Sequence, residues 1–230
     1  KNLDPASDIY FSQGPMDVLD HSCSKLGFGG KMCIDGSKKF EEELTDAKYS
    51  NLLDPPSLED AISQALPKFP EIKSANTKLI KDEIPCLILS VKKNRSGHIK
   101  ELHQSFCRSI KDVHSLKIIL YVEHTVDPNG LATALWRFCN NLDPKRDHIL
   151  FQESNNGSQY SCMGFDGTIK TSQFDGFKRD WPNIIVADDK TIRAIDEKWN
   201  ELGLGEFIPS PSLKFKDQMY GEEAVAAVPA

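Results

Sequence analysis

The sequence predicts an α/β fold: a mostly parallel sheet built on a βαβαβ core, with helices on both faces and an appended strand and loop segment. Short apolar segments rich in β-branched residues, at 84–91, 117–124 and 148–152, are typical of strands. Between them, residues 97–112 and 129–140 carry apolar side chains at steps of three and four, as amphipathic helices do. Buried strands that alternate with helices favour a parallel sheet, and right-handed crossovers place the second strand beside the first.

The amino-terminal part of the chain precedes this core. Residues 2–11 predict a turn and a short strand, residues 12–31 a glycine-rich loop, and residues 31–36 a second short strand with a turn. The Gly-Phe-Gly-Gly-Lys segment at 27–31 leaves two interpretations open, a phosphate-binding loop or a tight backbone corner. It lacks the spacing of a P-loop, which favours the corner.

A helix and a linker connect this part to the core. The segment from Ser57 to Asp60 has the shape of a capping box, and the helix that it opens ends at Pro67. Residues 67–82 are polar and are expected to form a connection. In the second core helix, Asp127 is the expected N-cap and Pro128 the first helical residue.

The segments after the core are less regular. Residues 152–161 predict a polar loop, and residues 171–187 predict irregular structure. Acidic residues then precede a helix at 190–202 whose apolar side chains share one side. Residues 204–230 are expected to be extended, with a short helix that docks on a partner subunit.

Two sequence patterns occur twice and in the same order. Asn-Leu-Asp-Pro-x-x-Asp occupies 2–8 and 141–147, and Met-x-x-Asp-Gly-Ser/Thr-x-Lys occupies 32–39 and 163–170. The offset falls from 139 to 131 residues, so the second copy has an intervening loop eight residues shorter. Two ordered matches indicate a duplicated unit.

The repeat sets the predicted domain organisation. Residues 1–50 are the remnant of a first repeat unit, 51–82 a helix and linker, 83–204 a complete α/β unit, and 205–230 a tail. The second copy follows a full βαβα stretch, whereas the first copy follows nothing. We therefore expect the chain to be a carboxy-terminal fragment of a longer protein, with the remnant packed on the complete unit as an appended hairpin.

Composition excludes two classes of function. A net charge of −6 and a pI near 5.6 argue against a nucleic-acid partner. No apolar run approaches the roughly 18 residues that a transmembrane helix needs, so no integral membrane segment is expected. The six cysteines include no Cys-x-x-Cys pair, and Cys86, Cys107 and Cys139 fall at apolar positions. This pattern indicates small core residues and a reducing, cytoplasmic compartment.

One set of candidates for chemistry lies where the second core strand ends. Doubly wound sheets bind ligands beyond the carboxyl ends of their strands. Glu123, His124 and Asp127 lie there, and a histidine with two carboxylates can support acid–base or metal chemistry. An independent α/β small-molecule-binding enzyme is therefore one hypothesis. No metal site is predicted, since His98 and His103 are five residues apart, off the spacing of helical zinc pairs.

A second hypothesis comes from motifs that occur together along the chain. They run from Gly14 to Asp20 and Gly29 to Gly36, from Leu89 to Gly97, from Ile118 to Asp147, and from Phe177 to Gly203. Together they resemble the carboxy-terminal region of the UbiD family of prenylated-flavin-dependent decarboxylases, over residues 2–44 and 80–204. The duplicated unit is similar to the longer members of that family, which act in menaquinone or ubiquinone synthesis.

The resemblance implies that the parent protein is a carboxy-lyase acting on an aromatic or polyprenyl-aromatic acid. It implies prenylated FMN, a divalent metal and a monovalent cation, all held by an upstream flavin-binding domain. The fragment itself would then carry no catalytic, cofactor-binding or metal residue and would be inactive alone. Its role would be to assemble a homo-oligomer and to join its own flavin-binding domain.

The resemblance also implies one contribution to the active site. In the family a loop of this region borders the substrate pocket, and by position that loop is residues 14–20. Met16 and Val18 are therefore the candidate pocket-lining residues, with simple loop packing as the alternative. The second copy lacks this segment.

Overall fold

The computed structural model describes residues 3–43, 54–110, 113–155 and 158–227. Contacts divide the chain into two compact units, residues 1–179 and residues 180–230. The predicted boundary after residue 204 falls inside the second unit.

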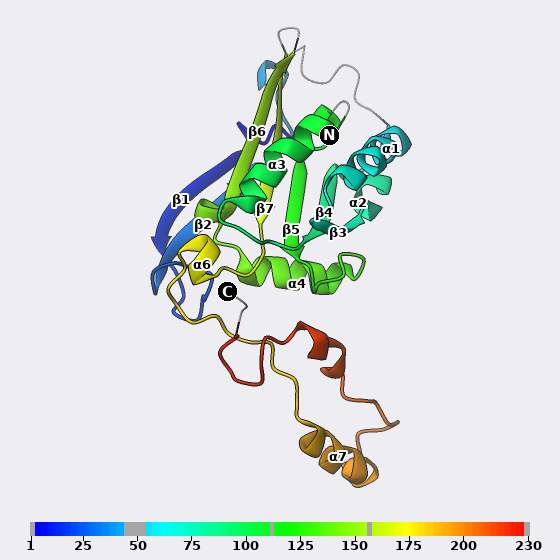
Figure 1. The fold of residues 1–230 in the computed structure, drawn as a ribbon. Coiled ribbons are helices and arrows are strands. Elements are labelled where there is room, and N and C mark those ends of the chain that lie inside the picture. The colour runs from blue at the N-terminus through cyan, green and yellow to red at the C-terminus, as the bar shows by residue number, and fades with distance from the viewer. Residues whose placement is uncertain (1–2, 44–53, 111–112, 156–157, 228–230) are drawn as a thin grey trace. The chain divides into compact units, whose positions relative to one another are not determined.

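The first unit contains a five-stranded sheet in the order β3-β4-β5-β7-β6 (Figure 1). Its strands are β3 (Ile72–Asn76), β4 (Cys86–Val91), β5 (Ile118–Glu123), β6 (His148–Asn155) and β7 (Ser158–Asp166). The central strands β4, β5 and β7 are parallel, whereas the edge strands β3 and β6 pair antiparallel to their neighbours. The predicted α/β class is confirmed, with a parallel core and two antiparallel edges.

Helices cover both faces of this sheet, as predicted. One apolar cluster joins the sheet to α1 (Pro55–Ala65) and α3 (His98–Ser109), and the other joins it to α4 (Leu131–Asn141). The clusters meet opposite faces because alternate residues of β4, such as Leu87 and Ile88, belong to different clusters. Shorter helical segments are η1 (Glu41–Glu43), η2 (Leu66–Lys68), α2 (Lys78–Lys81), η3 (Val113–Ser115), α5 (Pro144–Asp147) and α6 (Ser172–Asp175).

The third parallel strand is not the one that the sequence predicts. Residues 148–152 begin β6, which runs antiparallel, and the parallel strand beside β5 is β7. Residues 152–155 and 158–161 of the predicted polar loop belong to these two strands, and the two residues between them lie outside the described part of the chain. Edge strands keep polar side chains where only one neighbour covers them, so the outer half of this hairpin has the composition of a loop.

Other local predictions also need correction. The linker at 67–82 contains β3 and α2, and the cap of α1 is Asp54, whose side chain accepts from the Ser57 N–H. Asp127 does not cap α4, which begins at Leu131 after Gly130. The Asp127 carboxylate instead accepts from the backbone N–H of Asn129 at 2.9 Å, an Asx turn that uses the same hydrogen-bonding capacity.

A separate antiparallel hairpin, β1 (Ile9–Pro15) and β2 (Phe28–Ile34), packs against α5 and the β6–β7 hairpin. The ring of Phe11 stacks on His148 with centroids 3.8 Å apart, and Ile9 joins the apolar cluster that contains Phe165. The first repeat copy is thus an appended hairpin in the structure.

The second unit holds α7 (Asp189–Lys198), η4 (Trp199–Glu201) and η5 (Leu213–Gln218). The Asn183 amide donates to the carbonyls of Gly221 and Glu223, which ties the start of the unit to its end. The α7 helix buries none of its residues. Among the described residues of the chain, no helix has the length and apolarity to cross a membrane.

Candidate functional site

A buried ion cluster closes the base of the β6–β7 hairpin. Lys170 Nζ lies 3.4 Å from Oδ1 of Asp166, the last residue of β7, and 3.6 Å from Oδ2 of Asp147, which precedes β6. The Lys170 and Asp147 side chains are only 2% and 3% exposed. We call these residues the Lys170 cluster. Since each charge has an opposite partner, the cluster joins the two ends of the hairpin and leaves little capacity for a ligand.

The pKa shifts in the Lys170 cluster have clear physical causes. Burial raises the pKa of Asp147, although Lys170 and Arg146 oppose the shift. Burial also acts to raise the pKa of Asp166, but Lys170, Lys93 and the Thr168 hydrogen bonds outweigh it and lower that pKa. Asp166 is therefore the more firmly ionised of the two carboxylates.

A polar hollow of about 470 Å³ lies beside this cluster. Its lining includes Lys93, which follows β4, together with Arg146, Lys170 and Asp175. Lys93 Nζ contacts the Asp175 carboxylate at 2.8 Å, and Arg146 Nε donates to Asp147 at 2.7 Å. The charged groups named here are paired with one another, so these residues give the hollow a polar surface in which their charges are already balanced.

The predicted strand-end candidates do not converge on one site. Glu123 is buried, forms an ion pair with Arg137 and accepts from the Asn141 amide at 3.2 Å. His124 is exposed, and partial burial and Lys92 lower its pKa. With Asp127 held in its Asx turn, the structure gives Glu123 a role in anchoring α4 to β5.

The loop between β1 and β2 contains the predicted pocket residues. The Met16 N–H donates to Gly27 O at 2.9 Å, and Met16 is half-buried. Val18 is 67% exposed, and its neighbour Leu19 is 85% exposed in a turn held by the Asp17 side chain. Met16 and Val18 as pocket-lining residues stay a prediction, and the structure adds Leu19 as the most exposed apolar side chain of the turn from Asp17 to Asp20.

Two arginine side chains, Arg146 and Arg179, hold this loop by hydrogen bonds to its backbone. Arg146 donates to Ser22 O at 2.6 Å, and Arg179 donates to Cys23 O at 2.7 Å and to Asp20 O at 3.2 Å. Charge-assisted hydrogen bonds to backbone carbonyls fix the loop without using its side chains. The apolar tip is therefore presented to solvent on a supported base.

The glycine-rich segment proves to be a packing surface. A Cβ at Gly29 would overlap Cys23, and a Cβ at Gly30 would overlap the Asp143 carboxylate and the Lys145 backbone. Glycine is required here because α5 approaches the strand closely. A carboxylate over these amides also repels phosphate, which argues against a phosphate-binding loop. The predicted tight corner is confined to Gly27, at φ 69°, because residues 28–31 are extended in β2.

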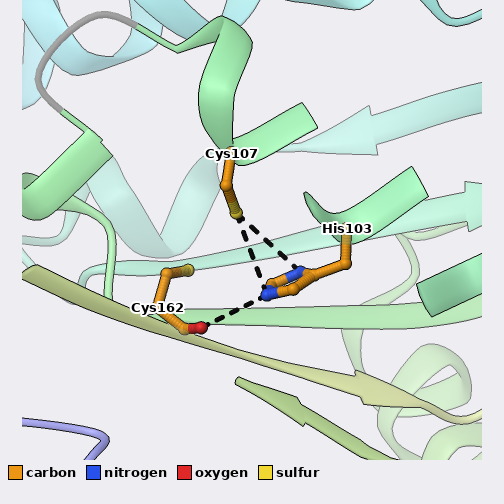
Figure 2. A group of neighbouring side chains, drawn as sticks. All are labelled: His103, Cys107 and Cys162. Atoms are coloured by element: carbon orange, nitrogen blue, oxygen red, sulfur yellow. Dashed lines mark hydrogen bonds between the residues drawn. The ribbon is translucent and has the colours of Figure 1, made fainter. Parts of the chain in front are cut away.

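Figure 2 shows a buried group that offers metal-ligand atoms, His103, Cys107 and Cys162, within 4.8 Å of one another. His103 Nε2 donates to Cys162 O at 3.2 Å, so Nδ1 is the nitrogen that accepts from the Tyr121 hydroxyl at 3.0 Å. Burial lowers the pKa of His103 and raises the pKa of Cys162, which favours neutral forms of both. With both ring nitrogens in use, the group is a hydrogen-bonded contact between α3 and β7.

Cysteine positions were predicted in part. Cys86 and Cys107 are buried, as expected, whereas Cys139 is exposed. Phe138 takes the buried position on α4, which turns the next residue outward.

Comparison with known proteins identifies the family. Residues 55–170, half of the chain, match the UbiD_C family, described as the 3-octaprenyl-4-hydroxybenzoate carboxy-lyase C-terminal domain. The chain belongs to this family. The match covers α1 to Lys170 and therefore holds the whole five-stranded sheet of the UbiD carboxy-terminal domain, while the β1–β2 hairpin lies outside it.

Similar curated proteins are much longer than this chain. Two proteins of Helicobacter pylori, described as uncharacterized, are 32% and 31% identical over 194 residues, covering 81% of this chain and 27% of theirs. An uncharacterized protein of Aeropyrum pernix is 23% identical over 175 residues and covers 68% of this chain and 36% of its own length. The chain thus spans about a quarter to a third of these relatives.

Solved structures of UbiD-class enzymes are similar at low identity. Vanillic acid decarboxylase of Sedimentibacter hydroxybenzoicus, in its open form, is 18% identical, with a TM-score of 0.43 over 64% of this chain and 32% of that one. The UbiD-class enzyme HmfF of Pelotomaculum thermopropionicum, in complex with FMN, is 17% identical, with a TM-score of 0.42 over 62% of this chain and 32% of that one.

Proposed function

We propose that this chain is the carboxy-terminal part of a carboxy-lyase that decarboxylates an aromatic or polyprenyl-aromatic acid in menaquinone or ubiquinone synthesis. The observation that carries the proposal is the match of residues 55–170 to the carboxy-terminal domain of 3-octaprenyl-4-hydroxybenzoate carboxy-lyase. The substrate in that name carries its carboxylate on a prenylated aromatic ring. The proposed substrate is therefore defined by its class, an aromatic or polyprenyl-aromatic carboxylic acid.

The reaction requires a cofactor, and we place it outside residues 1–230. Prenylated FMN, with a divalent metal and a monovalent cation at its phosphate, would be held by an upstream flavin-binding domain. Two features of this chain support that placement. Asp143 covers the glycine-rich segment that could otherwise accept a phosphate, and the charged groups named around the polar hollow are paired with each other.

The β1–β2 loop is the part of this chain that we place at the substrate pocket. Met16 would support the loop from its half-buried position, and Val18 would contact the acid together with Leu19. The support for this role is the exposure of two apolar side chains, 67% and 85%, on a loop fixed by Arg146 and Arg179. Exposed apolar groups on a rigid base are typical of a surface that another domain or a ligand covers.

We place the assembly function mainly in the second unit. The α7 helix is amphipathic yet buries none of its residues, and the following segment leaves Leu204, Phe207 and Ile208 more than half exposed. A helix with an uncovered apolar face is typical of an interaction surface. A cytoplasmic homo-oligomer would cover it.

The full-length protein, produced in cells that make prenylated FMN, tests the activity. We expect it to bind the flavin and to release CO₂ from a panel of 4-hydroxybenzoates with and without a prenyl chain. Residues 1–230 alone are the matched control and are expected to bind no flavin. A full-length protein that takes up no flavin, or a flavin-loaded protein that decarboxylates none of the acids, would contradict the proposal.

The loop is tested in the active full-length enzyme with Val18→Glu and Leu19→Glu. A carboxylate beside the carboxylate of the substrate should raise KM strongly and leave thermal stability unchanged, because both positions are exposed. Leu26→Glu, at a position 63% exposed in the same loop but away from its tip, is the control. If all three variants keep the wild-type KM and kcat, the loop has a packing role only.

A further inference from the structure

The two hairpins of this chain are equivalent residue by residue. In the first, Ile9 pairs with Ile34 and Phe11 with Met32; the repeat offsets convert these into His148 with Phe165 and Leu150 with Met163, which are the observed pairs. The sequence repeat therefore corresponds to one structural unit, with the same strand register in both copies.

The bases of the hairpins are closed in the same way. Lys39 Nζ lies 3.0 Å from Asp8 Oδ1 and 2.7 Å from Asp35 Oδ2, in the positions of Lys170, Asp147 and Asp166. The Ser37 N–H donates to Asp35 at 2.9 Å, as the Thr168 N–H donates to Asp166 at 3.0 Å. The β1–β2 hairpin thus shares its strand register and its closed base with the β6–β7 edge of the UbiD carboxy-terminal domain.

The copies also contact each other reciprocally. Asp143 lies against Gly30, and its equivalent Asp4 accepts from Ser161 Oγ at 2.6 Å. Ser161 is the repeat equivalent of Gly30. Contacts in which equivalent residues exchange roles are the signature of twofold symmetry. The two copies are therefore related by an approximate internal twofold axis between the hairpins.

The two copies differ in the strand and helix that pack against each hairpin. In the second hairpin, β7 pairs with β5, and Met163 donates its N–H to Lys117 O at 2.9 Å. In the first, the backbone N–H of Asp35 donates to Asp8 O on the β1 side at 2.8 Å. Because backbone donors alternate along a strand, the Met32 N–H points to the other edge of β2, where the described residues supply no strand. The donor equivalent to that of Met163 thus faces an open edge.

The side chains give the same comparison. Ile34 is 45% exposed and Met32 36%, whereas their equivalents Phe165 and Met163 are each 2% exposed. A Cβ at Gly167 would overlap Phe138 of α4, whereas a Cβ at the equivalent Gly36 would meet nothing within 4 Å. Within the described residues, the first hairpin therefore lacks the strand and helix that cover its counterpart.

We infer that the open edge of β2 binds a parallel strand from a second α/β unit, equivalent to residues 55–140, in the part of the longer chain that precedes residue 1. The inference does not depend on the proposed enzymatic activity. It is supported by the UbiD_C match, which ends at Lys170, the equivalent of Lys39, and by relatives in which this chain covers only 27% of the length. The whole protein would contain two such units about the internal twofold axis.

Hydrogen exchange of the full-length protein, read at single amides by mass spectrometry, tests this pairing. In the full-length protein, the amides of Met32 and Gly36 should exchange as slowly as those of Met163 and Gly167. Outward amides of the edge strand β3 are the internal control and should exchange fast. Fast exchange at Met32 and Gly36 would overturn the inference. Protection that disappears when the protein is diluted to monomers would also overturn it, because a second copy would then supply the strand.

A matched pair of variants tests the same surface without exchange data. In the full-length protein, Gly36→Ala should lower the unfolding temperature by about as much as Gly167→Ala does, since both methyl groups would enter an occupied site. If the edge is bare, Gly36→Ala should be neutral or slightly stabilising, because alanine reduces the entropy of the unfolded chain. That outcome would overturn the inference.

Discussion

Replacing the buried Arg137 with methionine should lower the free energy of unfolding of the 230-residue chain by more than a typical substitution of an exposed residue does. The Glu123 and Arg137 side chains are 5% and 6% exposed and form an ion pair, and Asn141 supplies one further hydrogen bond to Glu123 at 3.2 Å. Methionine keeps much of the packing volume but leaves the Glu123 carboxylate buried without a cation. Removing one partner of a buried pair costs about 3–5 kcal/mol.

Urea denaturation followed by far-UV circular dichroism measures this loss. With an m-value of about 2–3 kcal/mol per molar urea, the midpoint should fall by about 1–2 M. The Glu123→Gln/Arg137→Met double variant removes both charges and should recover most of the loss, because the desolvation penalty disappears with the charge. A loss below about 1 kcal/mol for Arg137→Met, or a double variant as unstable as the sum of its parts, would refute the reasoning. It would also reopen the hypothesis that Glu123 is free for chemistry.

Other consequences can be measured on the same chain. Gly164→Ala should cost about 1–3 kcal/mol in the same assay, because the new methyl group would lie 2.6 Å from His103 Nδ1; an unchanged midpoint would refute this contact. Burial lowers the pKa of His103 from 6.5, so the unfolded chain takes up this proton first and stability should fall as the pH drops below 6.5. His103→Gln should flatten that slope in denaturation curves recorded across the pH range, and an unaltered slope would assign it to other groups. A maleimide at neutral pH should label Cys33 and Cys139, which are exposed, and spare Cys86, whose pKa burial raises to about 12; mass spectrometry of the peptides checks the pattern, and rapid labelling of Cys86 would contradict its burial.

The sequence predicts the central features of this fold because they depend on local patterns. Leu102 and Phe106 lie on one side of α3, and their spacing alone identifies the helix. The repeat is detectable in the sequence because both hairpins are closed by the same contacts between one lysine and two aspartates, which keeps these residue types at equivalent positions. Family resemblance added the domain to which these patterns belong, and the UbiD_C match confirms it.

The remaining features depend on tertiary contacts that the sequence shows poorly. Gln152 and Glu153 lie on an edge strand with one neighbour, and their polarity is that of a loop. Asp127 is a suitable N-cap residue, but its carboxylate accepts a hydrogen bond from the Asn129 N–H in an Asx turn and is not used to cap α4. The role of residues 14–20 at a pocket stays a prediction, whereas the hydrogen bonds from Arg146 and Arg179 to the backbone of the β1–β2 loop come from residues more than 120 positions away and cannot be inferred from local sequence.

The closed base of each hairpin has a consequence for how this protein can change. When lysine and two aspartates lock the ends of a hairpin, its strand alignment no longer depends on the length of the turn at the far end. Evolution is then free to change the length of chain between the strands, and the first copy is eight residues longer there than the second.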